Sequence, residues 1–467
     1  MNRYTRSAHL TLLTFTLLFV QAAAVRADAV DDLVRAHMAE RNIPGAAVAV
    51  IRKGRVVKQK GYGVASVEFG VPVTNETAFE VGSVSKQMTA AGIMLLVQDG
   101  KVRLDETISA YLQGTPASWA PVTVRHLLAH SSGIKSYTGL TGFELSRRMT
   151  RDQFIERLAE HELEFTPGER TIYSNSGYNL LAYIIQEQSG KPFMDFMRER
   201  IFRPLGMTKT TERDPQYIIP LRAVGYEWRS GRLAGRDGNL TNLMGAGSIV
   251  STLSDMIKWE AALRGDTFLT PATKAESWKN YIYNSGEPSA YGLGWRVSDV
   301  RSHRLVGHTG QTAGFGAAIY RYTASDITVI VLTNLGEIGL PGPFAANIAK
   351  QFIPSLSLKT VKDSDDPDPD RGRLVSDILR RGLSHPANAE HFTESMNRSL
   401  RSTRAQATAD RLARHGTVST VRYVEEEKTA DRTAYRYLAS TQKRIFLWRV
   451  NFDDAGKINE IVLEEEE

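Results

Sequence analysis

Segments with the pattern of β-strands occur at both ends of the first 358 residues, and the stretch between them is helical in pattern. Residues 46–51 and 56–63 flank a short turn and predict a β-hairpin. Further strands are expected at 304–306, 314–322 and 327–332, and helices at 88–97, 122–128, 150–160, 180–188, 256–263 and 344–352. This order predicts an α+β fold, in which both ends supply strands to one antiparallel sheet with flanking helices and a helical insertion.

An acidic segment divides the chain. Residues 361–370 contain five aspartates and two prolines, with one large apolar side chain, Val361. We interpret residues 359–371 as a linker between a first domain, 28–358, and a second domain, 372–467. The second domain has helical patterns followed by four strand patterns, so we expect a small α+β domain. A turn at 453–456 predicts a hairpin between its last two strands.

The first 27 residues have the layout of a secretory signal peptide. Arg3 and Arg6 precede an apolar run over 10–20, and small residues at 25 and 27 precede Asp28. The apolar run is shorter than a bilayer requires, which favours cleavage over retention as a membrane anchor. We therefore expect a periplasmic or secreted protein with no membrane association beyond the signal peptide.

Composition excludes several kinds of chemistry. The net charge of +6 falls to +3 without the three arginines of the signal peptide, which is too small to indicate a nucleic-acid partner. Cysteine is absent, so disulfides, thiol nucleophiles and thiolate metal sites are excluded. His126 and His130 have the i, i+4 spacing of metal ligands, but Leu127 occupies the position where a metalloprotease has glutamate. We predict no metal and no cofactor, and expect these histidines to serve in helix packing and a loop hydrogen bond. The oligomeric state is left open.

Ser83 and Lys86 are the first candidates for catalysis. They are three residues apart at the start of a strongly apolar helix, so they share one face. Ser-x-x-Lys also occurs at Ser132 and Ser440, but neither of those opens a helix. A serine hydroxyl needs a base, and a lysine whose pKa is lowered by burial can provide one. The alternative is that Ser83 merely caps the helix.

Two further motifs support the catalytic interpretation. Tyr173-Ser-Asn175 is the only Tyr-x-Asn in the chain and precedes a predicted helix. His308-Thr-Gly310 is the only His-x-Gly and lies between two predicted strands. Each motif has an ordinary structural explanation when taken alone, but their combination and order form a pattern.

That pattern resembles the class C β-lactamase and penicillin-binding-protein-like family of serine hydrolases, over about residues 32–353. Supporting segments lie at 79–83, 127–134, 165–168, 178–181 and 247–252. The resemblance implies the β-lactamase/transpeptidase-like fold, with Ser83 as the acylated nucleophile, Lys86 as its proton acceptor and Tyr173 exchanging protons with the leaving group and the deacylating water.

The resemblance also assigns supporting positions. Asn175 would hold Lys86 and the substrate, and His308 and Gly310 would edge the site. Backbone N–H groups of Ser83 and Gln311 would form the oxyanion hole. One departure is that β-lactamases and many DD-peptidases have lysine where this chain has His308. A histidine near its ordinary pKa is mostly neutral at pH 7, which favours the esterase and D-aminopeptidase branches.

The sequence therefore predicts a serine hydrolase that forms an acyl-enzyme with an ester, an amide or a D-amino-acid peptide. The substrate would be a small molecule or a peptide, with cell-wall material as one candidate. We expect cleavage of short-chain esters and weak or absent nitrocefin turnover. The alternatives are β-lactamase or DD-peptidase activity, and an inactive binding or sensor protein on the same scaffold.

Overall fold

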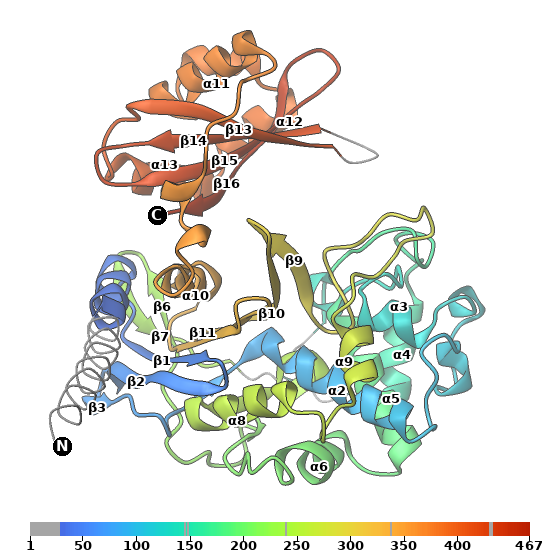
Figure 1. Ribbon diagram of the computed structural model, residues 1–467. Helices are drawn as coiled ribbons and strands as arrows, with labels where there is room; N and C mark the ends of the chain where they lie inside the picture. Colours follow the sequence, from blue (N-terminus) through green and yellow to red (C-terminus); the bar gives the residue numbers. More distant parts are fainter. Residues whose placement is uncertain (1–28, 144–145, 147–148, 239–240, 337–338, 429–432) are drawn as a thin grey trace, which may run out of the picture. The chain divides into compact units, whose positions relative to one another are not determined.

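The computed structural model describes residues 29–467 except 144–145, 147–148, 239–240, 337–338 and 429–432 (Figure 1). The predicted signal peptide, 1–27, lies outside the described residues. The chain forms two compact units, which divide between Phe352 and Ile353. Among the described residues, no helix combines the length and the apolar character needed to cross a membrane.

The first unit is built around an antiparallel sheet, which has seven strands among the described residues. In spatial order they are β3 (Val71–Pro72), β2 (Arg55–Ser66), β1 (Gly45–Arg52), β12 (Ile327–Thr333), β11 (Phe315–Tyr322), β10 (His303–Thr312) and β9 (Arg296–Val300). β1 pairs directly with β12, from Ala46 opposite Thr333 to Arg52 opposite Ile327. The expectation that both ends of the segment contribute to one antiparallel sheet is confirmed.

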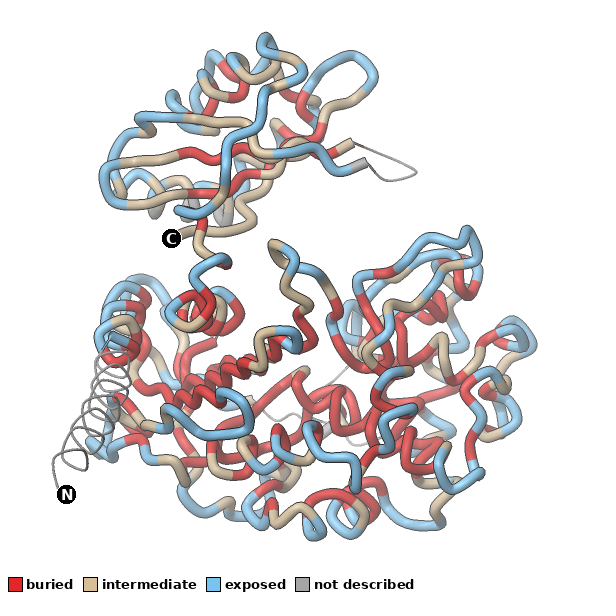
Figure 2. Tube along the Cα trace, viewed as in Figure 1, coloured by how far each residue is buried: buried red, intermediate tan, exposed pale blue. Residues whose placement is uncertain are grey.

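Both faces of the central strands are buried (Figure 2). Ala47 and Ala49 of β1 belong to the main core cluster, and Val48, which points to the opposite face, is equally buried. The helix α10 (Pro341–Lys350) covers that opposite face, since Gly342 lies against Tyr320 of β11. Such double burial explains why these strands read as continuous apolar runs.

The helical part of the first unit packs on the other face of the sheet. Its helices are α2 (Ser85–Gln98), α3 (Val124–Leu128), α4 (Arg151–Ala159), α5 (Asn175–Ser189), α6 (Phe193–Met197), α7 (Met244–Gly247), α8 (Leu253–Arg264) and α9 (Pro271–Ser277). Small sheets join β4 (Ala78–Glu80), β8 (Ile249–Thr252) and β5 (Thr211–Glu212), and β6 (Tyr226–Arg229) with β7 (Arg232–Gly235). Thr150 and Gln153 form the expected capping box of α4.

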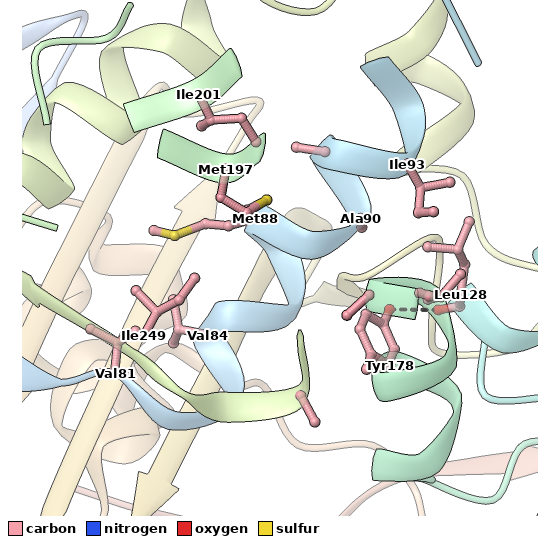
Figure 3. Packing of buried hydrophobic residues seen from close by; sticks show 14 of the residues in the cluster. Val81, Val84, Met88, Ala90, Ile93, Leu128, Tyr178, Met197, Ile201 and Ile249 are labelled. Atoms are coloured by element: carbon pink, nitrogen blue, oxygen red, sulfur yellow. Dashed lines mark hydrogen bonds between the residues drawn. The ribbon is translucent and has the colours of Figure 1, made fainter. Parts of the chain in front are cut away.

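Helix α2 runs through the core rather than along the surface. Every residue from Ser85 to Leu96 is buried, and α2 is packed by α5 and α7. Figure 3 shows side chains of α2, including Met88 and Ile93, in one apolar cluster with side chains from neighbouring elements. In the same cluster the Tyr178 hydroxyl of α5 donates to the carbonyl oxygen of Leu128 at 2.8 Å. This packing fixes the helix that carries the first sequence motif.

The second unit spans Ile353–Glu467 and has a core of its own. It comprises α11 (Pro369–Arg381), α12 (Glu394–Leu400), α13 (Thr403–Ala413) and the sheet β13 (Thr420–Lys428), β14 (Thr433–Ser440), β15 (Ile445–Phe452) and β16 (Ile458–Glu466). The predicted linker, 359–371, belongs to this unit. Asp368 caps α11 by accepting from the N–H of Arg371, and Pro369 occupies the first turn. Some of the Asp and Pro residues in the predicted linker therefore form the start of a helix.

Candidate active site

Ser83 lies in a single 3₁₀ turn, Gly82–Val84, immediately before α2. Its side chain does not cap the helix: the N-cap residue of α2 is Val84, and no side chain forms a cap hydrogen bond there. The Ser83 hydroxyl oxygen instead lies within hydrogen-bond distance of Nζ of Lys86, at 3.1 Å. The capping interpretation is therefore wrong, and the residue is partly exposed while its surroundings are buried.

Lys86 is completely buried, and burial lowers the pKa of its amine well below the usual value. Its Nζ lies 2.7 Å from Oδ1 of Asn175 and 2.7 Å from the carbonyl oxygen of Ala246. Three elements therefore converge on this amine: α2 carries it, α5 begins at Asn175, and α7 supplies Ala246.

The partners of Lys86 determine where its lone pair points. A neutral amine has two N–H donors and one acceptor lone pair, and both Asn175 Oδ1 and the Ala246 carbonyl can only accept. The lone pair therefore faces the remaining partner, the hydroxyl of Ser83. The amide of Asn175 is oriented by its Nδ2, which donates to Oγ1 of Thr138 at 3.2 Å. This is the geometry in which lysine can take a proton from serine.

Tyr173 lies in the loop before α5, and the Ser83 side chain is close enough to its phenol to affect the pKa of that group. Nζ of Lys86 is 4.8 Å from the centroid of its ring. Although 36% of the residue is exposed, burial of the phenol group raises its pKa. The phenol therefore remains protonated at neutral pH. The hydroxyl, amine and phenol predicted from the sequence are brought together.

The third motif lies on β10, beside the 3₁₀ turn of Ser83. A Cβ added to Gly310 would lie 2.0 Å from the Val81 carbonyl oxygen and 2.9 Å from the Ser83 nitrogen. A Cβ added to Gly82, whose φ is 50°, would lie 2.7 Å from the backbone nitrogen of Gln311. Only glycine permits this approach of two backbones. The backbone nitrogens of Ser83 and Gln311 thereby lie on facing segments, as an oxyanion hole requires.

His308 is buried and neutral. Its Nδ1–H donates to the carbonyl oxygen of Thr309 at 2.5 Å, so its Nε2 accepts from the Tyr291 hydroxyl at 2.7 Å. Burial, followed by the charge of Lys86, lowers its pKa to about 3. The expectation that His308 has a pKa near the ordinary value is therefore wrong. The lower pKa nevertheless gives the same result at pH 7, a neutral side chain.

A cation that the sequence analysis missed lies at the start of β9. Arg296 is exposed and pairs in register with Gly307, the residue before His308. Its charge partly opposes the rise in the pKa of Tyr173 caused by burial, and it adds to the lowering of the pKa of His308. The guanidinium therefore acts on the groups of the site. Arg296 belongs to no short motif. Only the pairing of β9 with β10 reveals it.

The remaining sequence candidates have structural explanations. Ser132 is buried in a loop, where its hydroxyl accepts from the N–H of Ile134, and Ser440 ends a strand of the second unit. His126 accepts from the N–H of Thr123 in the capping box of α3. His130 makes the expected loop hydrogen bond, accepting from the N–H of Ser174.

Comparison with known proteins places the chain among its relatives. The chain is 30% identical over 306 residues to penicillin-binding protein 4* of Bacillus subtilis, covering 61% of this chain and 66% of that protein. It is 27% identical over 320 residues to protein flp of Staphylococcus aureus, covering 67% of this chain and 64% of that protein. The chain thus matches less than two thirds of the length of either relative.

Solved structures share the fold. The D-amino acid amidase from Ochrobactrum anthropi SV3 is 27% identical with a TM-score of 0.60, covering 71% of this chain and 98% of the amidase. An octameric penicillin-binding protein homologue from Pyrococcus abyssi is 23% identical with a TM-score of 0.60, and the match covers 94% of this chain and 98% of the homologue. At this identity the similarity shows the fold alone. Residues 30–345 match the Beta-lactamase family. The chain therefore belongs to the Beta-lactamase family of penicillin-binding-protein-like serine hydrolases.

Proposed function

We propose that this protein is a serine hydrolase that forms an acyl-enzyme at Ser83. The observation that carries the proposal is the buried amine of Lys86, which two acceptors orient so that its lone pair faces the Ser83 hydroxyl. Its lowered pKa supports a neutral amine at physiological pH, and a neutral amine is the form that can act as a base.

Acylation follows from this arrangement. The Ser83 oxygen attacks the substrate carbonyl carbon while its proton passes to Nζ of Lys86. Negative charge develops on the carbonyl oxygen, which the backbone N–H groups of Ser83 and Gln311 stabilise. The Tyr173 phenol, whose raised pKa keeps it protonated, donates to the leaving group as the bond to the carbonyl carbon breaks. The Lys86 ammonium returns the proton to Tyr173, which completes the transfer.

Deacylation reverses the roles. A water molecule takes the place of the leaving group, loses a proton through Tyr173 to Lys86, and attacks the Ser83 ester. The ester bond breaks, the acid product leaves, and Ser83 regains its proton. Two acyl transfers through one nucleophile predict burst kinetics whenever deacylation is the slower step.

We propose an ester, an amide or a D-amino-acid peptide as the substrate. Similarity to an enzyme named D-amino acid amidase supports this range. The neutral His308 supplies no charge for a substrate carboxylate, and the exposed Arg296 is the nearby cation that could. We infer short-chain ester cleavage with weak or absent nitrocefin turnover.

A fluorophosphonate probe, which labels activated serines, tests the function. Wild type should be labelled, and Ser83→Ala should abolish labelling with little change in melting temperature. Ser440→Ala is the matched control, because it removes the serine of a Ser-x-x-Lys motif remote in sequence from the site. Absence of labelling in folded wild type would instead support an inactive binding or sensor protein.

Substrate class is tested with p-nitrophenyl acyl esters, D-amino-acid anilides and nitrocefin. The proposal expects turnover of short acyl esters that Ser83→Ala removes. Fast nitrocefin hydrolysis would contradict the inference drawn from His308.

We also propose export, with the mature chain beginning at Asp28, on the evidence of the amino-terminal sequence. N-terminal sequencing of the protein from an envelope or culture-medium fraction of a bacterial host should give Asp28. Recovery of the protein only with Met1 retained would contradict this.

A further inference from the structure

His130 occupies a conformation that its own backbone does not favour. It follows α3, it is 1% exposed, and its φ is 58°, in the left-handed region. A residue other than glycine pays about 1–2 kcal/mol for this conformation, with Asn and Asp the best tolerated. The surrounding structure must therefore hold His130 in place. Its N–H donates to the carbonyl oxygen of Leu127 at 3.3 Å, and its other contacts involve the loop of Tyr173 and the aromatic neighbours of that residue.

Two hydrogen bonds connect His130 to the residues on either side of Tyr173. The N–H of Ile172 donates to the His130 carbonyl oxygen at 3.1 Å. The N–H of Ser174 donates to Nδ1 of the His130 ring, also at 3.1 Å. One residue thus fixes the backbone before and after the phenol, in a loop that has no regular secondary structure of its own.

The His130 ring also packs on the Tyr173 ring, with centroids 4.2 Å apart and planes inclined by 35°. Tyr178 and Tyr291 enclose it further, at 5.0 and 4.7 Å. Because Nδ1 accepts a hydrogen bond, the proton of the neutral ring is on Nε2. Nε2 is buried without a hydrogen-bond partner among the described residues, and these three rings surround the imidazole that carries it.

We propose that His130 is a positioning residue that holds the Tyr173 phenol against the Ser83 hydroxyl, by two backbone hydrogen bonds and one ring contact. It does not itself transfer a proton, because its Nδ1 is occupied by the main chain and its Nε2 is enclosed. The inference rests on the proposed function, since it assigns His130 a task only if Tyr173 transfers protons during catalysis.

Two variants separate the contacts. His130→Asn tolerates the left-handed conformation and can present Oδ1 to the Ser174 N–H, but it loses the ring. His130→Gly tolerates the conformation but loses both side-chain contacts, the hydrogen bond to the Ser174 N–H and the packing on the Tyr173 ring. A displacement of about 1 Å at a reacting group costs about 10²-fold. We expect kcat for a p-nitrophenyl ester to fall about 10²-fold in His130→Gly and less in His130→Asn, with KM changed by less than about threefold.

His126→Asn is the matched control. It makes the same substitution four residues earlier in the chain. The His126 imidazole also accepts a hydrogen bond from a main-chain N–H, but its ring contact is with Tyr281 and not with Tyr173. Its kcat should stay within about threefold of wild type. Melting temperatures of all variants identify any that fail to fold.

The pH profile distinguishes positioning from general support of the fold. The titratable groups that face His130 and Tyr173 are Lys86 of α2, Tyr178 of α5, Tyr291, Arg296 of β9 and His308 of β10. Loss of the His130 ring admits water to the phenol, which brings its raised pKa down towards the ordinary value. The alkaline limb of kcat/KM should therefore move to lower pH in His130→Gly and stay in place in His126→Asn.

Each outcome is decisive. A lower kcat with a shifted alkaline limb in folded His130→Gly supports positioning. Unchanged kcat and profile overturn it, and if the glycine variant does not fold, the same criteria apply to His130→Asn. Wild type that is neither labelled by fluorophosphonate nor active on any ester overturns the proposed function itself, and labelled wild type with unaffected variants overturns only the role of His130.

Discussion

One methyl group on Gly310 tests whether β10 and the turn of Ser83 must touch for catalysis. In Gly310→Ala the new Cβ would lie 2.0 Å from the Val81 carbonyl oxygen, whereas Cβ contacts below 3.0 Å are essentially never observed. Interiors are close-packed and cannot absorb this overlap, so β10 must move away by at least about 1 Å. That movement carries the Gln311 nitrogen away from Ser83.

The expected loss of catalytic rate follows from the same displacement. A displacement of about 1 Å lowers rates about 10²-fold, and loss of one oxyanion donor lowers them 10²–10³-fold. We therefore expect kcat/KM for p-nitrophenyl acetate to fall about 10²–10³-fold in Gly310→Ala. Overpacking of this kind costs about 1–3 kcal/mol in stability, so the variant should remain folded.

Stopped-flow measurement of the p-nitrophenol burst isolates acylation, the step that builds the oxyanion. Gly235→Ala is the control, because a Cβ there meets nothing within 4 Å, and it should acylate at the wild-type rate. If folded Gly310→Ala acylated within threefold of wild type, the contact between β10 and the turn would have no catalytic role.

Three further changes test the electrostatics. Asn175→Asp places a carboxylate beside the Lys86 amine and raises its pKa, so the acid limb of kcat/KM should move to higher pH with activity at pH 7 lowered. Glu80 is buried with its pKa raised to about 7, mainly by desolvation despite two arginines within 4 Å. The native state therefore binds more protons than the unfolded state between about pH 4.5 and 7, and the free energy of unfolding should fall by roughly 3 kcal/mol over this range. Chemical denaturation should show that Glu80→Gln lacks this loss; equal pH dependence of both proteins would contradict the pKa. Arg296→Gln should raise KM about 10-fold or more for a D-alanyl peptide with a free carboxylate and leave KM for its amide unchanged; equal effects on both would show that Arg296 does not bind the carboxylate.

The pair Ser83 and Lys86 could be predicted from the sequence because the features that indicate it lie in one short segment. Ser83 and Lys86 are three residues apart on a helix whose apolar run is evident in the sequence. Tyr173 and Asn175 could be connected to them only through family resemblance, because nothing in their own segment specifies a partner. Ala246, which completes the environment of Lys86, contributes a backbone carbonyl, and no residue type marks such a group.

Longer-range features were inaccessible for related reasons. The pKa of His308 depends on burial between elements and on the charge of Lys86, which lies on another element, and Arg296 reaches the site through strand pairing. The linker prediction took Asp and Pro as loop formers, whereas at Asp368 and Pro369 the same residue types begin a helix. Capping and loop signals use the same residues, so composition alone could not separate them.

The pairing of β1 with β12 also sets the order of folding. Ala46 meets Thr333 only after almost the whole first unit has been synthesised, so the central strand pair cannot form until residue 333 has emerged. Contacts this distant in sequence slow folding, and they leave an apolar strand without its partner in the interim. Any C-terminal truncation before residue 327 would leave one edge of β1 permanently unpaired, and such fragments should aggregate rather than form a smaller domain.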